Sequence, residues 1–219
     1  MAAELDECVD SPNPYSHRDT HASIGNTNTT TISGQYEDFS VVTRRSLTHT
    51  LAEHKLSLDD SAIKSLMAAY DSLSTFPDVS PALKSLASTS NITAVVFSNG
   101  THAMISNSVN KSPDLEPHAK TFTQLVDVEE VKRYKPAPEV YEHLAGKVGK
   151  EGKHEEMWLV SGNTFDVVGA RCFGMQAAWV DRAGNGWVDG LVEGDKGRPT
   201  VVVKSLEEVV EAVKKHAQQ

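Results

Sequence analysis

The sequence has few cysteines and no surplus of positive charge. Its 219 residues include two cysteines, Cys8 and Cys172, which lie far apart, match no metal-ligand spacing and are expected to be free thiols. The formal net charge is −9, which argues against nucleic acids and anionic membrane surfaces as partners. No apolar run approaches a membrane span, and the acidic start MAAELDECVD does not resemble a signal peptide. A cytoplasmic location is therefore expected.

The first 33 residues also lack the large apolar side chains that a core needs. They hold Pro12, Pro14 and the polar run 26–31, so an irregular or disordered segment is expected over 1–33. The pattern then changes. Apolar residues at helical spacing predict one helix over 35–51 and a second over 57–73, with Asp59 or Asp60 as its cap. Two successive helices predict a small helical subdomain over 34–76.

Beyond this subdomain, short apolar strands alternate with amphipathic helices. The strands are expected at 93–97, 124–126, 157–160, 176–180 and 200–203. The helices are expected at about 101–110, 137–149, 164–173 and from Ser205 onward. This alternation predicts an α/β fold with a doubly wound parallel sheet in residues 77–219.

Polar groups follow two of these strands, at the sheet edge where ligands bind in such folds. Ser98-Asn99-Gly100 follows the strand 93–97, and the segment 161–166, Ser-Gly-Asn-Thr-Phe-Asp, follows the strand 157–160 and opens a helix. A helix N-terminus favours anions, so these groups are placed to handle a small acidic substrate. The ordinary alternatives are a common turn at Ser98 and a simple helix cap at Asn163 or Thr164.

Lys135 is the candidate cation of this site. It directly precedes Pro136, which steers it away from helical backbone and toward an extended or turn conformation. Its ammonium can then balance a buried carboxylate such as that of Asp166. A solvated surface lysine is the ordinary alternative, and Asp166 alone could simply complement the helix dipole.

Three segments in order carry a family resemblance: Ser98-Asn-Gly100, the run 135–141 (KPAPEVY), and the run 161–170 (SGNTFDVVGA). They resemble the second, third and fourth motifs of the haloacid dehalogenase superfamily, and most closely its type II L-2-haloacid dehalogenases. The segment 34–47 is similar to the start of a cap helix in that group. The resemblance covers Gly34 to the C-terminus and implies a Rossmann-like core with a helical cap, no cofactor or metal, and a possible homodimer formed through the cap.

The resemblance also implies an activity. A short 2-haloalkanoic acid would be hydrolysed to the 2-hydroxy acid through an aspartyl ester, a covalent route that splits one displacement into two steps. Ser98 and Asn99 would bind the substrate carboxylate and the leaving halide, Lys135 would stabilise the nucleophilic carboxylate, and Asp166 would position or activate water. The other implied roles are orientation of the site by Tyr141 and Ser161, halide contact by Asn163, and an apolar pocket lined by Phe39 and Phe165.

The sequence departs from the family pattern at the first motif, an apolar strand ending in Asp-x-x-Gly-Thr. Asp10 and Asp19 precede the cap, but neither follows an apolar strand or has glycine three residues later. In this fold the missing strand lies mid-sheet, so its absence predicts a gap. Residues 1–33, a partner chain or the missing part of a longer protein could fill it, and the last is favoured.

Two other functions remain open from the sequence. A catalytically impaired member of the family would keep only carboxylate binding, because no nucleophile motif is recognised. A phosphatase of the same superfamily is the weaker alternative, because the fourth motif supplies a single carboxylate, Asp166, where Mg²⁺ needs several oxygen ligands.

Overall fold

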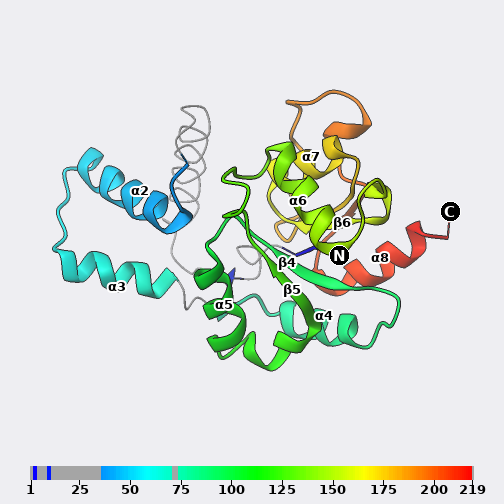
Figure 1. The fold of residues 1–219 in the computed structure, drawn as a ribbon, viewed down its shortest axis with the longest axis horizontal. Coiled ribbons are helices and arrows are strands. Elements are labelled where there is room, and N and C mark those ends of the chain that lie inside the picture. The colour runs from blue at the N-terminus through cyan, green and yellow to red at the C-terminus, as the bar shows by residue number, and fades with distance from the viewer. Residues whose placement is uncertain (1, 4–8, 11–35, 71–73, 219) are drawn as a thin grey trace.

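The computed structural model describes residues 2–3, 9–10, 36–70 and 74–218 (Figure 1). Six strands form one sheet in the order β5-β4-β1-β6-β7-β8, and every neighbouring pair in it is parallel. The strands of this sheet are β1 (Ala2–Ala3), β4 (Ala94–Phe97), β5 (Phe122–Val126), β6 (Trp158–Ser161), β7 (Gln176–Val180) and β8 (Val201–Val203). The order confirms the predicted doubly wound α/β core.

Helices cover both faces of the sheet, with α6 and α7 on one side and α4, α5 and α8 on the other (Figure 1). Because both faces are covered, β4 and β6 are buried along their whole length. The α-helices are α2 (Phe39–Glu53), α3 (Asp60–Tyr70), α4 (Val79–Ala87), α5 (His102–Lys111), α6 (Pro138–Val148), α7 (Thr164–Phe173) and α8 (Val209–His216). Single 3-10 turns lie at Glu116–Thr121, His154–Glu156, Asp195–Gly197 and Leu206–Glu208.

The centre of the sheet is occupied by the first residues of the chain. Ala2 pairs with Val95 of β4 and with Leu159 of β6, and Ala3 pairs with the next residue of each strand. Of the three ways in which the expected gap could be filled, the structure shows the first, because residues from the segment 1–33 occupy the middle of the sheet. A strand of two residues is too short to show any periodicity in a sequence, and here its neighbours on both sides hold it in place.

A second, two-stranded sheet joins another early segment to the segment that follows the helical pair. In it, β2 (Val9–Asp10) runs antiparallel to β3 (Ser74–Thr75). The segment 1–33 thus contributes two short strands, and the remainder of it lies outside the described residues.

Helices α2 and α3 stand beside the sheet rather than on it (Figure 1). Asp38 caps α2, since its carboxylate accepts hydrogen bonds from the Val41 amide at 3.0 Å and the Ser40 hydroxyl at 2.5 Å. Asp59 caps α3 by accepting from the Ala62 amide at 2.7 Å, so of the two candidate caps Asp59 is confirmed. Among the described helices, none has both the length and the apolar character that crossing a bilayer requires.

Candidate active site

A buried ion pair lies at the carboxyl end of the sheet. The Nζ of Lys135 is 3.4 Å from Oδ2 of Asp166, and both side chains are fully buried. Lys135 Nζ also donates to the Phe97 carbonyl at 3.4 Å and lies 5.0 Å from the centre of the Phe97 ring. Lys135 is therefore a buried cation, as the sequence predicted, and the solvated alternative is wrong. The peptide bond between Lys135 and Pro136 is cis.

The segment after β6 brings further polar groups to the same carboxylate. Ser161 is fully buried, and its hydroxyl donates to Asp166 Oδ2 at 3.4 Å while accepting from the Asn163 amide at 3.0 Å. Asn163 occupies the cap position of α7, yet its side chain makes no capping hydrogen bond. A simple capping role is thus wrong for Asn163, because its side-chain amide makes no hydrogen bond to the end of the helix.

Asp166 presents its two oxygens to different surroundings. Oδ2 faces Lys135 and Ser161, whereas Oδ1 is buried and has no hydrogen-bond partner among the described residues. A buried acceptor without a partner is costly, and such a group in a folded protein is a common mark of a functional site. Oδ1 is therefore the oxygen of Asp166 that is placed to accept a hydrogen bond from a bound molecule.

Ser98 and Asn99, which follow β4, are both buried at this end of the sheet. The Asn99 Oδ1 accepts from the Lys135 amide at 2.8 Å, and the Ser98 Oγ accepts from the Gly100 amide at 3.0 Å. Besides these accepted bonds, the Asn99 side-chain amide and the Ser98 hydroxyl each carry N–H or O–H groups that can donate to a ligand. Donors beside a buried lysine suit an anion.

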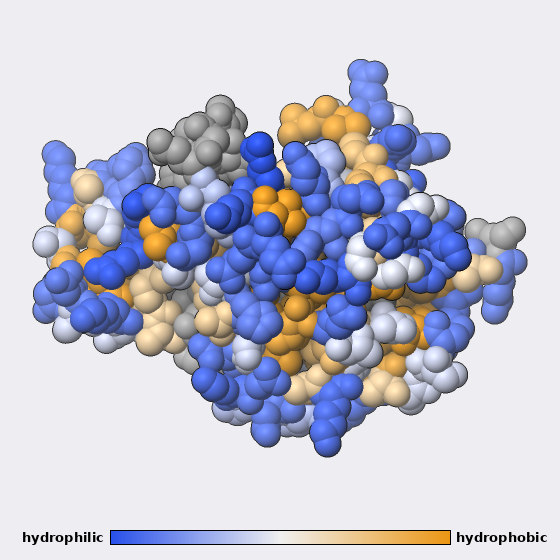
Figure 2. Space-filling model, in the orientation of Figure 1, coloured by the Kyte–Doolittle hydropathy of each residue, from blue (hydrophilic) through white to orange (hydrophobic). Residues whose placement is uncertain are grey.

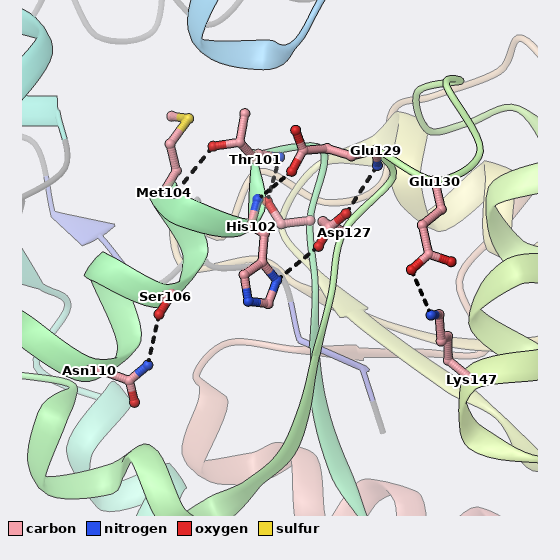
Figure 3. Close-up of polar contacts among 11 residues, drawn as sticks. Thr101, His102, Met104, Ser106, Asn110, Asp127, Glu129, Glu130 and Lys147 are labelled. Carbon is pink, nitrogen blue, oxygen red and sulfur yellow. Dashed lines mark hydrogen bonds and ion pairs between the residues drawn. The ribbon is translucent and has the colours of Figure 1, made fainter.

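A polar network fixes the loops at the rim of this end of the sheet (Figure 3). The Glu129 carboxylate accepts from the His102 amide at 2.8 Å, and the His102 ring lies 3.1 Å from the Asp127 carboxylate. Asp127 also accepts from the Glu129 amide at 3.1 Å. Because His102 begins α5 and the two acids follow β5, these contacts tie together the loops after β4 and β5. Within the part of the chain that the structure describes, no group of three or more His, Cys, Asp or Glu side chains forms a metal site.

Tyr141 lies beneath the site, fully buried in α6, with its ring packed on Phe97 at 5.8 Å and on Phe173 at 5.6 Å. Its contact with α7 depends on Gly169, where a Cβ atom would stand 2.3 Å from the Tyr141 Oη and 2.6 Å from the Pro136 Cβ. Only glycine allows this approach of α7 to the Lys135-Pro136 segment.

Of the two predicted lining phenylalanines, Phe39 belongs to the cap and Phe165 to α7. Phe39 is buried against Tyr134, at 6.1 Å between ring centres, and Tyr134 immediately precedes Lys135. Phe165 is half-buried beside Asp166 in the first turn of α7. Phe165 is thus the sequence neighbour of Asp166, whereas Phe39 contacts the residue before Lys135, and the lining of a common pocket stays a prediction.

Tyr134 was missed by the sequence reasoning, although it connects the cap to the site. Its hydroxyl donates to the Glu37 carbonyl at 2.5 Å, just before α2, and its ring packs against Tyr36 at 5.3 Å. Burial, aided by Glu129, Asp38 and Asp127, raises the pKa of Tyr36 to about 12, and burial also raises the pKa of Tyr134. Both phenols therefore keep their protons at neutral pH. The position of Tyr134, one residue before the lysine, was the available signal.

The acidic residues considered as nucleophiles are only partly described. The backbone of Asp10 pairs with Ser74 in the two-stranded sheet, not in the parallel sheet. Asp19 and Cys8 lie outside the described residues. Cys172, on α7, is a free exposed thiol, as expected.

The sequence and the fold can be compared with those of known proteins. A family model described as haloacid dehalogenase-like hydrolase matches residues 11–174. The chain is 34% identical to haloacetate dehalogenase H-2 of Moraxella sp. (strain B) over 156 residues, 70% of this chain and 65% of that protein. It is 32% identical to an (S)-2-haloacid dehalogenase of Pseudomonas fluorescens over 178 residues, 81% of this chain and 73% of the relative.

Among solved structures, the fold is similar to that of L-2-haloacid dehalogenase from Xanthobacter autotrophicus with chloropropionic acid covalently bound. The TM-score is 0.78 at 23% identity, and the match covers 97% of each chain. At this identity the likeness shows a shared fold.

Proposed function

The chain belongs to the haloacid dehalogenase-like hydrolase family, and from this premise we propose that it hydrolyses the carbon–halogen bond of a short 2-haloalkanoic acid to give the 2-hydroxy acid. The observation that carries the proposal is the buried pair of Lys135 and Asp166 at the carboxyl end of the sheet, with the donors of Ser98 and Asn99 beside it. The chain covers only 65% of its Moraxella relative, so the substrate class is proposed rather than transferred.

The first step that we propose is a displacement at carbon 2. An enzyme carboxylate oxygen attacks carbon 2 and forms an ester bond with it. The carbon–halogen bond breaks, and the halide leaves with the electron pair of that bond. The Ser98 hydroxyl and the Asn99 amide donate hydrogen bonds to the substrate carboxylate and the leaving halide. The ammonium of Lys135 holds the attacking carboxylate in its charged form.

The second step is hydrolysis of the ester at its carbonyl carbon. A water oxygen attacks this carbon, its proton passes to Oδ1 of Asp166, and the bond between the carbonyl carbon and the product oxygen breaks. The product oxygen takes the proton back from Asp166 and leaves as the hydroxyl of the 2-hydroxy acid. The enzyme carboxyl group that is released loses the second water proton to solvent, which restores the carboxylate. The proposal uses Oδ1 because it is the buried oxygen without a hydrogen-bond partner among the described residues.

Isotope transfer tests both steps and identifies the nucleophile. During turnover of L-2-chloropropionate in ¹⁸O-water, the label enters the enzyme carboxylate that formed the ester, and peptide mass mapping locates it. Glu4 and Asp6 are the first acidic residues after β1 in the sequence, and Asp10 and Asp19 are the other candidates. Label on one of these residues together with halide release supports the proposal. Absence of halide release from a folded, monodisperse sample overturns it and leaves a protein that only binds carboxylates.

An Asp166→Asn variant separates the steps. With the proton acceptor removed, the ester forms but its hydrolysis slows, so the variant should accumulate a mass increase of one propionate unit per chain. Asp189→Asn, in the exposed loop after β7, is the control and should turn over normally. If Asp166→Asn instead becomes labelled and hydrolyses the substrate as the unchanged protein does, Asp166 has no role in the second step.

The phosphatase alternative is tested separately. Release of phosphate from a phosphate ester that depends on Mg²⁺ would favour it.

The proposal also includes a homodimer formed through the cap. It is supported by three leucines exposed on the cap helices and their connection: Leu56 at 62%, Leu58 at 39% and Leu66 at 47%. Light scattering should give twice the chain mass, and a Leu56→Lys, Leu66→Lys variant should give the mass of one chain. Equal masses for both proteins would contradict a cap interface.

A cytoplasmic location completes the proposal. The exposed free thiol of Cys172 supports it, because such thiols persist in reducing compartments. Cell fractionation with antibody detection tests the location, and recovery of the protein outside the cytosol would overturn it.

A further inference from the structure

Trp179 connects β7, the strand that pairs with β6, to the segment that carries Ser161 and Asn163. It lies in β7, is buried to 7% exposure, and pairs in register with Ser161 of β6. Its indole Nε1 donates a hydrogen bond of 2.9 Å to the carbonyl of Gly162. A buried indole needs an acceptor, so the bond alone is ordinary. The choice of acceptor is less ordinary, because Gly162 lies between Ser161 and Asn163, two residues of the site.

Gly162 cannot be held by a side chain of its own. The turn around it is fixed by the Asn163 amide, which donates to Ser161 Oγ, and by the indole bond to its carbonyl. Rotation of the peptide after Gly162 would change the direction of the Asn163 amide and so the orientation of the Ser161 hydroxyl, which donates to Asp166. The indole bond therefore controls groups that the proposed reaction uses.

A second tryptophan supports the first from the loop between β7 and β8. The ring of Trp187 meets that of Trp179 edge to face at 5.1 Å, and its Nε1 donates to the Gly197 carbonyl at 3.1 Å. The two rings form one cluster with Val167 of α7, the residue after Asp166. Asp181 folds the loop by accepting from the amides of Asn185 and Gly186.

The rest of this loop differs from Trp187 in its exposure. Val188 and Leu191 are 83% and 92% exposed, and Figure 2 shows apolar atoms at the top of the view, where the loop lies in Figure 1. Trp187 is half-buried although its neighbours project into solvent. The loop is therefore anchored on Trp179 by this one large side chain.

We propose that Trp179, braced by Trp187, is a positioning residue that fixes the Ser161–Asn163 turn for the reaction. It touches neither substrate nor reacting atoms, and acts through the Gly162 carbonyl. This inference rests on the proposed function for its kinetic part and on the geometry alone for its structural part.

The test is Trp179→Phe, which keeps an aromatic ring but lacks the N–H donor. Trp187→Phe is the matched control, because it keeps an aromatic ring to pack against Trp179 and loses only its bond to the Gly197 carbonyl, outside the site. For Trp179→Phe we expect kcat for halide release to fall about tenfold with KM within about twofold, because one orienting hydrogen bond is lost. The Asn163 amide should exchange its hydrogen about tenfold faster. Trp187→Phe should leave both nearly unchanged at a similar loss of thermal stability.

Each outcome decides a different question. Equal behaviour of the two variants in kcat and in Asn163 exchange would overturn the positioning role and leave a purely structural pair of tryptophans. If the unchanged protein releases no halide, the proposed function fails. The exchange comparison then still decides whether Trp179 fixes the turn: faster exchange in Trp179→Phe alone upholds it, and unchanged exchange overturns it.

Discussion

At the scale of single residues, the site depends on a buried ion pair, in which two charged side chains are shielded from water. Lys135 and Asp166 are both fully buried, so removal of either leaves the other uncompensated. We expect Lys135→Met to lower the free energy of unfolding by about 3–5 kcal/mol at pH 7, the usual cost of breaking a buried pair. Urea unfolding measures this loss.

The double variant Lys135→Met, Asp166→Leu is the control for this prediction. It leaves no unpaired charge, so it should recover part of the stability while remaining inactive. A single variant as stable as the unchanged protein would show that the two groups are not an interdependent pair.

The packing of α7 against Tyr141 and Pro136 depends on the absence of a side chain at Gly169. A Cβ there would stand 2.3 Å from the Tyr141 hydroxyl, so Gly169→Ala should destabilise by about 1–3 kcal/mol and reduce activity by moving Tyr141 and Pro136. Gly146→Ala in α6 is the matched control, because its Cβ would meet nothing closer than 3.6 Å. That change should stabilise by about 0.5–1 kcal/mol through helix propensity. Thermal unfolding of both variants tests the contrast, and equal effects would contradict it.

At the scale of elements, the contact between the cap and the core depends on neutral phenols. Burial raises the pKa of Tyr36 from 10.0 to about 12, so the folded state holds this proton more tightly than the unfolded state. The stability contributed by Tyr36 is complete below pH 10 and is lost as the pH rises through 12. Tyr134 contributes in the same direction.

We therefore expect the free energy of unfolding to fall between pH 10 and pH 12, and to fall less in Tyr36→Phe, which has no such proton. Urea unfolding at pH 8, 10 and 11 measures the slopes. Parallel slopes for the two proteins would show that Tyr36 does not titrate with folding.

Element types were predictable from the sequence wherever a helix or strand was long enough to show its period. The strand β4 is a continuous apolar run and most residues of β6 and β7 are apolar, and α7 ends at Phe173 with Gly174 as its cap, as predicted. The helix expected from Ser205 begins with a 3-10 turn, and α8 proper starts at Val209. Ser205 caps this turn by accepting from the Glu207 amide, which is a local bond that a pattern of residues can reveal.

At the scale of the whole molecule, the sheet depends on its shortest strand. The backbone of β1 bridges β4 and β6, so Ala3→Pro, which removes an amide donor and restricts the backbone, should prevent stable folding or lower the melting temperature strongly. Ala3→Val is the control, because a β-branched residue suits a strand. Circular dichroism melting compares them. A normally folded Ala3→Pro protein would show that the pairing of β1 is dispensable.

The site was predictable to the extent that its groups follow strands directly. Ser98, Ser161 and Asp166 were named from their positions after β4 and β6, and Lys135 from the proline that follows it. The structure brings Lys135, Ser161 and Asp166 together. Contacts between distant elements could not be read in this way. The bond from Trp179 to Gly162 and the filling of the centre by Ala2–Ala3 depend on which strands become neighbours, and a single sequence does not encode this in any local pattern.

The place of β1 has a consequence for synthesis of the protein. A chain leaves the ribosome N-terminus first, so β1 emerges well before Val95 and Leu159, the residues with which it pairs. Until β6 has emerged, the nascent chain carries strands whose edges lack their final neighbours. Pairing between segments so distant in sequence is slow, so this protein should rely on chaperones during translation more than its modest size implies.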